Sequence, residues 1–361
     1  MGKIKVLIVD DSAFMRKLIS DFLSENPAIQ VVGTARNGEI ARKKIKELQP
    51  DVVTLDVEMP VLNGLEALKI IMQENPLPVV MLSSDTKEGT DTTFKAMEAG
   101  AIDFVAKPSG TISLDLHKVK DELINKVLSA SKANIKQLLK FSAVKENIRS
   151  DQAQYSKIEP SIKSDHTNQW HQCDKKIVCI GTSTGGPRAL QQVLINIPKN
   201  IDAPILIVQH MPEGFTKSLA ERLNSICKIR VKEAEEGEII RSGTAYIAPG
   251  GSHLKLKHGT PVILADQEEP PRNGHRPSVD VMFESVSMLE NYAKIAVIMT
   301  GMGNDGAKGL AVLKKTGAVK AIAESQQSSI VFGMPKAAIE TNLIDEVEDV
   351  ENIAQAILKF V

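Results

Sequence analysis

A serine in a short glycine-rich segment is the residue of this sequence best suited to covalent chemistry. The apolar run 176–180 leads into Gly-Thr-Ser-Thr-Gly at positions 181–185, and a helix-like segment begins near Arg188. A serine between a strand and a helix is the context in which a G-x-S-x-G motif is informative. The glycines leave room around the hydroxyl, and the first turn of the helix directs free N–H groups toward it. Ser183 is therefore predicted to be a nucleophile.

A serine nucleophile needs a base to take its proton and an acid to orient that base. His210 follows the apolar run 205–209, which is predicted to be a strand that leaves the sheet at the same edge as Ser183. Taken singly, a histidine at a strand end is more often structural than catalytic. The remaining candidates are His253 and His275, in loops rich in Gly and Pro, and His258, in a predicted hairpin turn where we expect it to be exposed.

The candidate acid is Asp305, which lies in a glycine-dense loop after the apolar run 295–299. Asp305 could also cap the helix that begins near Ala307, and the two roles are compatible. The order Ser, His, Asp along this chain differs from the order Ser, Asp, His of the α/β-hydrolases. This order argues against a lipase or esterase of that fold.

A second group of polar residues ends the predicted strands of the first 125 residues. Three carboxylates gathered at one sheet edge would repel one another unless a cation lay among them, and hard oxygen ligands suit Mg²⁺. A lysine opposite them would pair with an anion beside the metal. Ordinary capping is the alternative for any single residue. The residues are Asp10, Asp11, Asp56, Ser83 and Lys107.

The elements that must position these residues are strands alternating with helices. Residues 1–125 contain five short apolar runs with helical segments between them, which predicts a parallel, doubly wound five-stranded sheet. Ligands of such sheets bind at the carboxyl ends of the strands. The alternation resumes over residues 174–361 and predicts a second α/β domain with a largely parallel sheet. Residues 121–139 are predicted to extend the last helix of the first domain, so that residues 126–173 comprise this helical extension and then a polar linker.

Length and composition limit the class of protein. A chain of 361 residues is long enough for two domains, and its net charge of −1 gives no indication of a nucleic-acid partner. The sequence lacks an apolar run of the roughly 20 residues that span a bilayer, so membrane insertion is not expected. Three cysteines without metal-ligand spacing fit a reducing cytoplasm.

Residues 1–125 resemble the receiver domain of bacterial two-component response regulators. The strand-end residues above carry the resemblance, together with Met59-Pro60 and Asn63-Gly64 after the third strand. The resemblance implies that Asp56 accepts a phosphoryl group whose oxygens Lys107 contacts. It also implies a phospho-switch formed by Ser83 and Phe104. The implied Mg²⁺ ligands are Asp10, Asp11, Asp56 and the backbone carbonyl of Glu58.

Residues 175–361 resemble the catalytic domain of the chemotaxis protein-glutamate methylesterases, the CheB family. The matching stretches are 181–187, 209–211, 276–280, 300–306 and 331–335, whereas residues 323–326 depart from the family's usual sequence. The resemblance implies a triad of Ser183, His210 and Asp305, with the N–H groups of Met302 and Thr184 as oxyanion hole. No cofactor is expected for the esterase.

The joint resemblance implies a phosphorylation-regulated enzyme of chemotactic adaptation. Its substrates would be methylated chemoreceptors, whose glutamate methyl esters it would hydrolyse and whose glutamines it could deamidate. A chemotaxis histidine kinase would be the phosphodonor. Two alternatives stay open: a catalytically inactive adaptor with a phosphorylation-dependent interface, and a receiver with a DNA-binding output. Intact Ser183, His210 and Asp305 disfavour the first, and strand-rich patterning disfavours the second.

Overall fold

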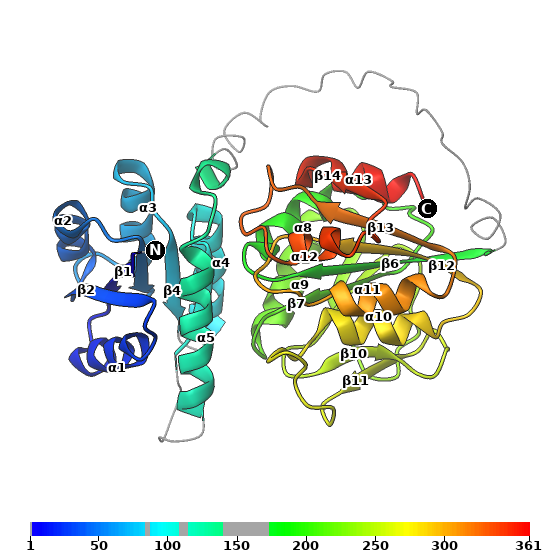
Figure 1. Cartoon of the computed structure of the whole chain (residues 1–361), viewed down its shortest axis with the longest axis horizontal. Coiled ribbons are helices and arrows are strands. Elements are labelled where there is room, and N and C mark those ends of the chain that lie inside the picture. The colour runs from blue at the N-terminus through cyan, green and yellow to red at the C-terminus, as the bar shows by residue number, and fades with distance from the viewer. Residues whose placement is uncertain (1, 84–86, 108–114, 140–172) are drawn as a thin grey trace, which may run out of the picture. The chain divides into compact units, whose positions relative to one another are not determined.

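The chain forms two compact units, residues 1–139 and residues 140–361, as Figure 1 shows. The computed structural model describes residues 2–83, 87–107, 115–139 and 173–361. Most of the predicted linker, residues 140–172, therefore lies outside the described residues. Among the described residues, every helix is too short or too polar to cross a membrane.

The first unit is built on a five-stranded parallel sheet in the order β2-β1-β3-β4-β5, as predicted. Helices cover both faces, so the central strands are apolar throughout rather than alternating, and the side chains from Val6 to Val9 are fully buried. The strands are β1 (Ile4–Val9), β2 (Ile29–Ala35), β3 (Val52–Asp56), β4 (Val79–Ser83) and β5 (Asp103–Ala106).

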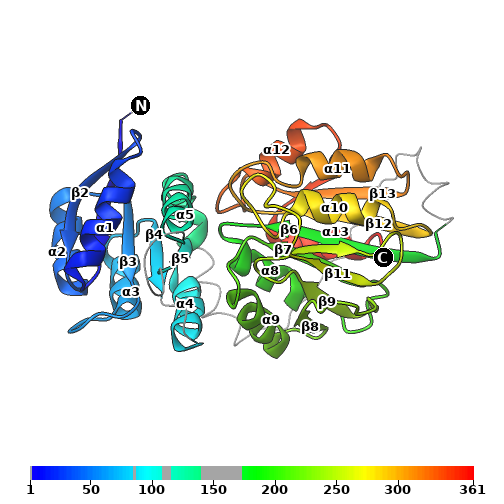
Figure 2. The ribbon, with the colours of Figure 1, turned by 90° about the horizontal axis from the view of Figure 1, so that it is seen from below.

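Side-chain caps fix where the helices of the first unit begin. Ser12, Asn37 and Asn63 each accept a backbone N–H three residues further on, at the starts of α1, α2 and α3. α1 and α5 contact each other, while α2, α3 and α4 form a separate row (Figure 2). The helices are α1 (Ala13–Ser24), α2 (Gly38–Leu48), α3 (Gly64–Glu74), α4 (Lys87–Ala99) and α5 (Asp115–Ala130).

The predicted helical extension over 121–139 is interrupted in the structure. α5 ends at Ala130, and helical residues resume at 135–139 after a turn. The hydroxyl of Ser131 donates to the carbonyl of Leu128 at 2.8 Å, and a turn follows in which Lys132 N–H donates to Ser129. Such local side-chain bonds compete with helical ones and favour termination.

The second unit contains a seven-stranded parallel sheet in the order β14-β13-β12-β6-β7-β9-β8. The three apolar runs that precede Ser183, His210 and Asp305 are the strands β6, β7 and β12, and the short edge strands β8 and β14 were not anticipated. The strands are β6 (Lys175–Thr182), β7 (Ile205–Gln209), β8 (Arg230–Glu233), β9 (Thr244–Ile247), β12 (Tyr292–Ile298), β13 (Val319–Glu324) and β14 (Glu346–Glu348).

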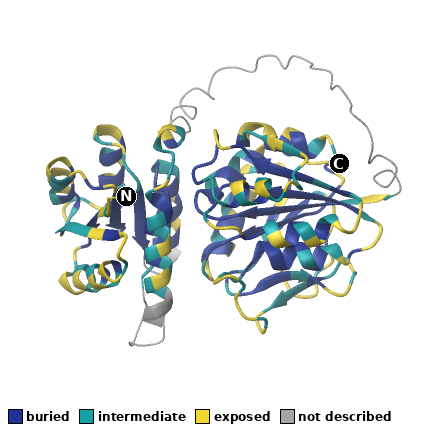
Figure 3. Ribbon diagram, in the orientation of Figure 1, coloured by how far each residue is buried: buried dark blue, intermediate teal, exposed yellow. Residues whose placement is uncertain are grey.

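Helices enclose this sheet from both sides, and Figure 3 shows its strands buried beneath helices with exposed outer faces. An antiparallel hairpin of β10 (His253–Leu256) and β11 (Ile263–Asp266) packs beside α10. On one face lie α8 (Gly186–Ile195), α9 (Phe215–Ile226) and α13 (Val350–Leu358), and on the other α10 (Val279–Ser287), α11 (Ala307–Lys314) and α12 (Met334–Glu340). The carboxyl ends of the neighbours β12, β6 and β7 thus meet at one edge.

Candidate active site

Ser183 lies directly after β6 at a sharp turn into α8, as the G-x-S-x-G motif predicted. Gly185 has φ 78°, a left-handed conformation that glycine adopts without strain, and Gly186 N–H donates to the carbonyl of Ser183 at 2.7 Å. A Cβ on Gly186 would lie 2.0 Å from the amide oxygen of Gln209, so this position requires glycine. The turn leaves Ser183 7% exposed at the sheet edge.

His210 is held beside the serine turn by the ends of two adjacent strands. Thr182 of β6 and Gln209 of β7 are partners in the sheet register, and His210 N–H donates to the carbonyl of Thr182 at 3.1 Å. The amide of Gln209 donates to the carbonyl of Ser183 at 3.0 Å and accepts from the hydroxyl of Thr182 at 2.7 Å. This bracing role of Gln209 was not predicted, because an amide at a strand end has no distinctive motif.

The ring of His210 forms a buried pair with Asp305. His210 Nε2 and Asp305 Oδ2 are 2.8 Å apart, and the two residues are 7% and 2% exposed. An ionised carboxylate only accepts hydrogen bonds, so Nε2 carries the proton and Nδ1 is left as the basic nitrogen. Among the described residues Nδ1 has no hydrogen-bond partner. The serine-protease template has the opposite arrangement, with the acid on Nδ1.

Asp305 is saturated with donors. Burial alone would raise its pKa, but the bond and charge of His210, with two backbone amides, hold the pKa well below its ordinary value. The carboxylate is therefore charged and fixed in orientation. Its donors, at 2.7–3.1 Å, are the Ser278 hydroxyl, the N–H groups of Val279, Asp280 and Gly306, and the His210 ring.

The loop after β12 comes close to the serine and presents an N–H group. A Cβ on Gly301 would lie 2.7 Å from the Cβ of Ser183, so only glycine permits this approach. Ser183 N–H is occupied, since it donates to the carbonyl of Thr300 at 3.0 Å. The N–H of Met302 makes no hydrogen bond within the described residues. Met302 thus keeps a donor next to the serine, whereas the predicted contribution of Thr184 stays a prediction.

Thr300 connects the loop to the serine turn. Its hydroxyl donates to the carbonyl of Thr184 at 2.9 Å, and its N–H donates to a carboxyl oxygen of Glu324 at 2.7 Å. Burial raises the pKa of Glu324 to about 7, against the opposing effect of the hydrogen bonds from Thr300 and Ser328. Glu324 belongs to the stretch 323–326 that departs from the family's usual sequence, and its place under the loop was not predicted.

The other three candidate histidines of the second unit occupy distinct places. His258 is exposed between β10 and β11, as expected. His253 is buried, its Nε2 lies 3.2 Å from the carbonyl of Pro270, and burial lowers its pKa. His275 stacks on His210 with ring centroids 3.9 Å apart and planes 8° from parallel. Of these three, His275 therefore contacts the candidate base.

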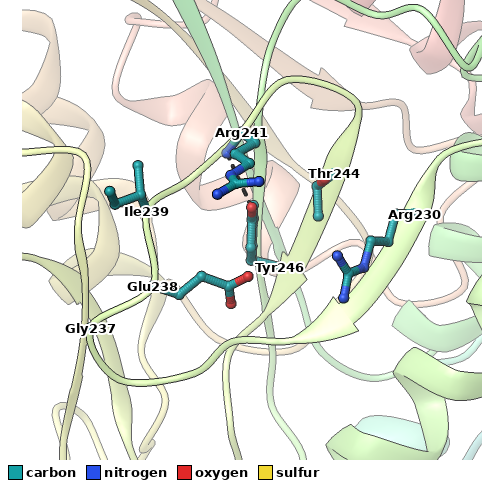
Figure 4. A pocket seen from close by; sticks show the side chains of 7 residues that line it. All are labelled: Arg230, Gly237, Glu238, Ile239, Arg241, Thr244 and Tyr246. Atoms are coloured by element: carbon teal, nitrogen blue, oxygen red, sulfur yellow. Dashed lines mark hydrogen bonds between the residues drawn. The ribbon is translucent and has the colours of Figure 1, made fainter.

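A cavity of about 440 Å³ lies elsewhere in the second unit (Figure 4). Arg230 and Thr244, which begin β8 and β9, line it, whereas Ser183 and His210 follow the carboxyl ends of parallel neighbours. It contains none of the triad residues. Its lining is Arg230, Gly237, Glu238, Ile239, Arg241, Thr244 and Tyr246.

The strand ends of the first unit bring three carboxylates together, as predicted. One ligand oxygen from each of Asp10, Asp11 and Asp56 lies within 4.8 Å of the others. Lys107 Nζ is 2.7 Å from Asp56 Oδ2 and 3.0 Å from Asp10 Oδ2. Burial, with a smaller contribution from Asp10, raises the pKa of Asp56 to about 6 although Lys107 opposes it. Hard oxygen donors at this spacing fit Mg²⁺, and the lysine fits an anion beside it.

The remaining predicted receiver residues lie on or directly after strands of the same sheet. Ser83 is buried at the end of β4, and its hydroxyl donates to the carbonyl of Gly89 at 3.1 Å. Phe104 on β5 is buried, and Lys126 Nζ lies 5.6 Å from its ring centroid. Glu58 N–H donates to Asp56 at 3.2 Å. Of these three residues, Glu58 thus contacts the carboxylate cluster directly through its backbone N–H.

Comparison with known proteins relates both units to described families. The family model of the CheB methylesterase matches residues 178–357, and that of the response regulator receiver domain matches residues 6–117. The Thermotoga maritima CheB methylesterase catalytic domain, as a crystal structure, is 45% identical and aligns with a TM-score of 0.50. That alignment covers 52% of this chain and 100% of the Thermotoga chain.

Relatives from other organisms match nearly the whole chain. A Halalkalibacterium halodurans protein named protein-glutamate methylesterase/protein-glutamine glutaminase is 58% identical over 359 residues, 99% of this chain and 98% of the relative. A Bacillus subtilis protein of the same name is 50% identical over 357 residues, 98% and 97% of the two chains. The family resemblance and the two-domain α/β fold inferred from the sequence are confirmed.

Proposed function

The chain belongs to the CheB methylesterase family, with a response regulator receiver domain preceding the catalytic domain, and from this premise we propose that it hydrolyses glutamate methyl esters on chemoreceptors. The reaction uses Ser183, His210 and Asp305. The observation that supports this proposal most directly is the buried His210–Asp305 pair, with Nδ1 of His210 left as a base at the edge where Ser183 lies.

Acylation begins when Ser183 Oγ attacks the ester carbonyl and His210 Nδ1 takes the hydroxyl proton. The Met302 N–H, with that of Thr184, stabilises the oxyanion of the tetrahedral intermediate. Collapse of the intermediate breaks the C–O bond, and His210 returns its proton to the departing methanol. Asp305 stays ionised throughout and stabilises the imidazolium that forms.

Deacylation repeats these steps with water. His210 Nδ1 removes a proton from the water that attacks the glutamyl-serine ester, and the proton then goes to Ser183 Oγ as the free carboxylate leaves. The same acyl chemistry acts on glutamine side chains, with ammonia as the leaving group. The curated relatives are named for both activities.

The receiver makes the esterase conditional. A chemotaxis histidine kinase transfers a phosphoryl group to Asp56, and Lys107 contacts its oxygens. Bound Mg²⁺, held by Asp10, Asp11, Asp56 and the Glu58 carbonyl, would supply charge neutralisation. About two added negative charges at this sheet edge reorient Ser83 and Phe104.

Methanol release from methylated receptor membranes tests the esterase. We expect Ser183→Ala to lower the rate about 10⁴-fold or more, because the nucleophile and its base act as a unit. Ser225→Ala, an exposed serine on α9, is the matched control and should retain the wild-type rate. Equal rates for wild type and Ser183→Ala would refute the nucleophile assignment.

Stimulation by a small-molecule phosphodonor with Mg²⁺ tests the regulation. Wild type should be stimulated, and Asp56→Ala should keep its basal rate without stimulation, since the phosphoryl acceptor is gone. Persistent stimulation of Asp56→Ala would contradict regulation through this residue.

A further inference from the structure

His275 belongs to a rigid two-residue turn. The backbone N–H and carbonyl groups of Arg272 and His275 exchange two hydrogen bonds of 3.0 Å, with Asn273 and Gly274 between them. These two residues have φ angles of 53° and 82°. Positive φ at both central positions is the type I′ conformation, which Asn-Gly strongly favours. The sequence therefore specifies the geometry of the turn locally.

Arg272 fastens this turn to the body of the domain. Its guanidinium donates to both carboxylate oxygens of Glu284 on α10, at 2.6 and 2.7 Å, and to Glu269 at 2.8 Å. Both bonds to Glu284 come from Nη1 and the bond to Glu269 from Nη2, so two carboxylates together restrict the orientation of the guanidinium. The backbone that carries the His275 side chain is thus held in a fixed position on the domain.

The chain continues from this turn directly to the acid of the triad. Ser278, Val279 and Asp280 donate to the carboxylate of Asp305, three to five residues after the histidine that stacks on His210. One short segment, residues 272–280, therefore contacts both members of the His210–Asp305 pair. This segment contacts Asp305 through hydrogen bonds and His210 through the stacked ring of His275.

The bond to Asp305 alone does not fix the direction of Nδ1. The ring is also attached through its Cβ atom, and one hydrogen bond at Nε2 limits rotation about the Cβ–Cγ bond without fixing the plane of the ring. The stacked ring of His275, at 3.9 Å and 8°, fixes the plane of the His210 ring. We propose that His275 is a positioning residue of the esterase: its ring face sets the plane of His210 so that Nδ1 faces the Ser183 hydroxyl. This inference rests on the proposed function.

The test compares three replacements in the full-length protein: His275→Ala, His275→Leu and His275→Phe. Alanine removes the contact, leucine keeps bulk without a flat face, and phenylalanine keeps the flat face without ring nitrogens. We expect kcat for methanol release to fall about 10- to 100-fold for alanine and leucine, part of the 10²–10⁴ that a positioned base contributes, with KM unchanged. Phenylalanine should recover most of the loss. His258→Ala, the exposed hairpin histidine, is the control and should match wild type.

Thermal midpoints are measured for every variant, because equal midpoints with unequal kcat separate positioning from folding. A His275→Ala enzyme within twofold of wild type would overturn the inference. So would recovery by leucine equal to that by phenylalanine, or a phenylalanine variant as slow as alanine. Ser183→Ala in the same assay tests the proposed function separately. Activity in that variant would refute the esterase mechanism. If that variant is inactive, the rates of the His275 variants alone decide whether His275 positions His210.

Discussion

Two buried aspartates, one in each unit, behave in opposite ways. Asp56 is the last residue of β3, whereas Asp305 lies in the loop between β12 and α11. Asp56 accepts one backbone N–H, at 3.2 Å, and shares Lys107 with Asp10, and its pKa is raised to about 6. Asp305 accepts five donors, and its pKa is lowered.

The difference is the number of donors that the protein itself supplies. A carboxylate with few protein donors still has oxygen lone pairs for a cation and for a reacting group, which suits a phosphoryl acceptor. A carboxylate whose lone pairs are all engaged is unreactive but rigid, which suits the acid that orients a histidine. A buried aspartate thus acquires a reactive or a supporting role from the number of N–H groups around it.

Asp305→Asn should give the largest effect. In either orientation, the NH₂ group of the amide would face hydrogen-bond donors that now bond to an oxygen of Asp305. The amide therefore cannot orient the Nε2–H tautomer of His210. We expect kcat for methanol release to fall about 10³- to 10⁴-fold, with a lower thermal midpoint. Asp202→Asn, an exposed carboxylate of the same unit, is the control. A kcat within tenfold of wild type would contradict the role given to donor saturation.

Glu324 tests the comparison with a third buried carboxyl. It accepts from Thr300 N–H at 2.7 Å and from Ser328 at 3.0 Å and has no cation partner among its described contacts, and burial raises its pKa to about 7. In the unfolded chain its pKa is near 4.5. The folded state therefore retains this proton as pH rises from 4.5 to 7, while the unfolded state loses it. Wild-type stability falls across that window, and the full penalty is present above about pH 7.

Glu324→Gln removes this titration and imitates the protonated form. Relative to wild type, we expect the variant to gain stability as pH rises from 4.5 to 7, to a total on the order of 3 kcal/mol. Denaturant unfolding at several pH values measures the difference between the two proteins. A difference that stays constant with pH would show that the carboxyl does not titrate in this range.

Local patterns in the sequence predicted most of the fold and of the candidate site. Apolar runs predicted the strands, and polar residues at their ends predicted which side chains meet, from Asp56 with Lys107 to His210 with Asp305. Contacts that depend on tertiary packing could not be predicted. His275 stayed one of several alternatives because stacking leaves no trace in spacing. β8 and β14 are short edge strands with mixed polarity, and their pairing depends on neighbours far away in sequence.

Asp10→Asn should have the smallest effect. It tests the carboxylate cluster of the first unit, where the protein supplies few hydrogen-bond donors. Asp10 contributes one of the three clustered oxygens, and asparagine keeps its shape while removing one charge. We expect Mg²⁺ affinity, measured by calorimetry on the full-length protein, to fall about 10-fold, since losing a ligand charge weakens a hard-cation site. Asp51→Asn is the control, because this exposed carboxylate only accepts the N–H of Lys5. Unchanged affinity in Asp10→Asn would mean that the cluster is structural and that a shortage of donors does not by itself create a cation site.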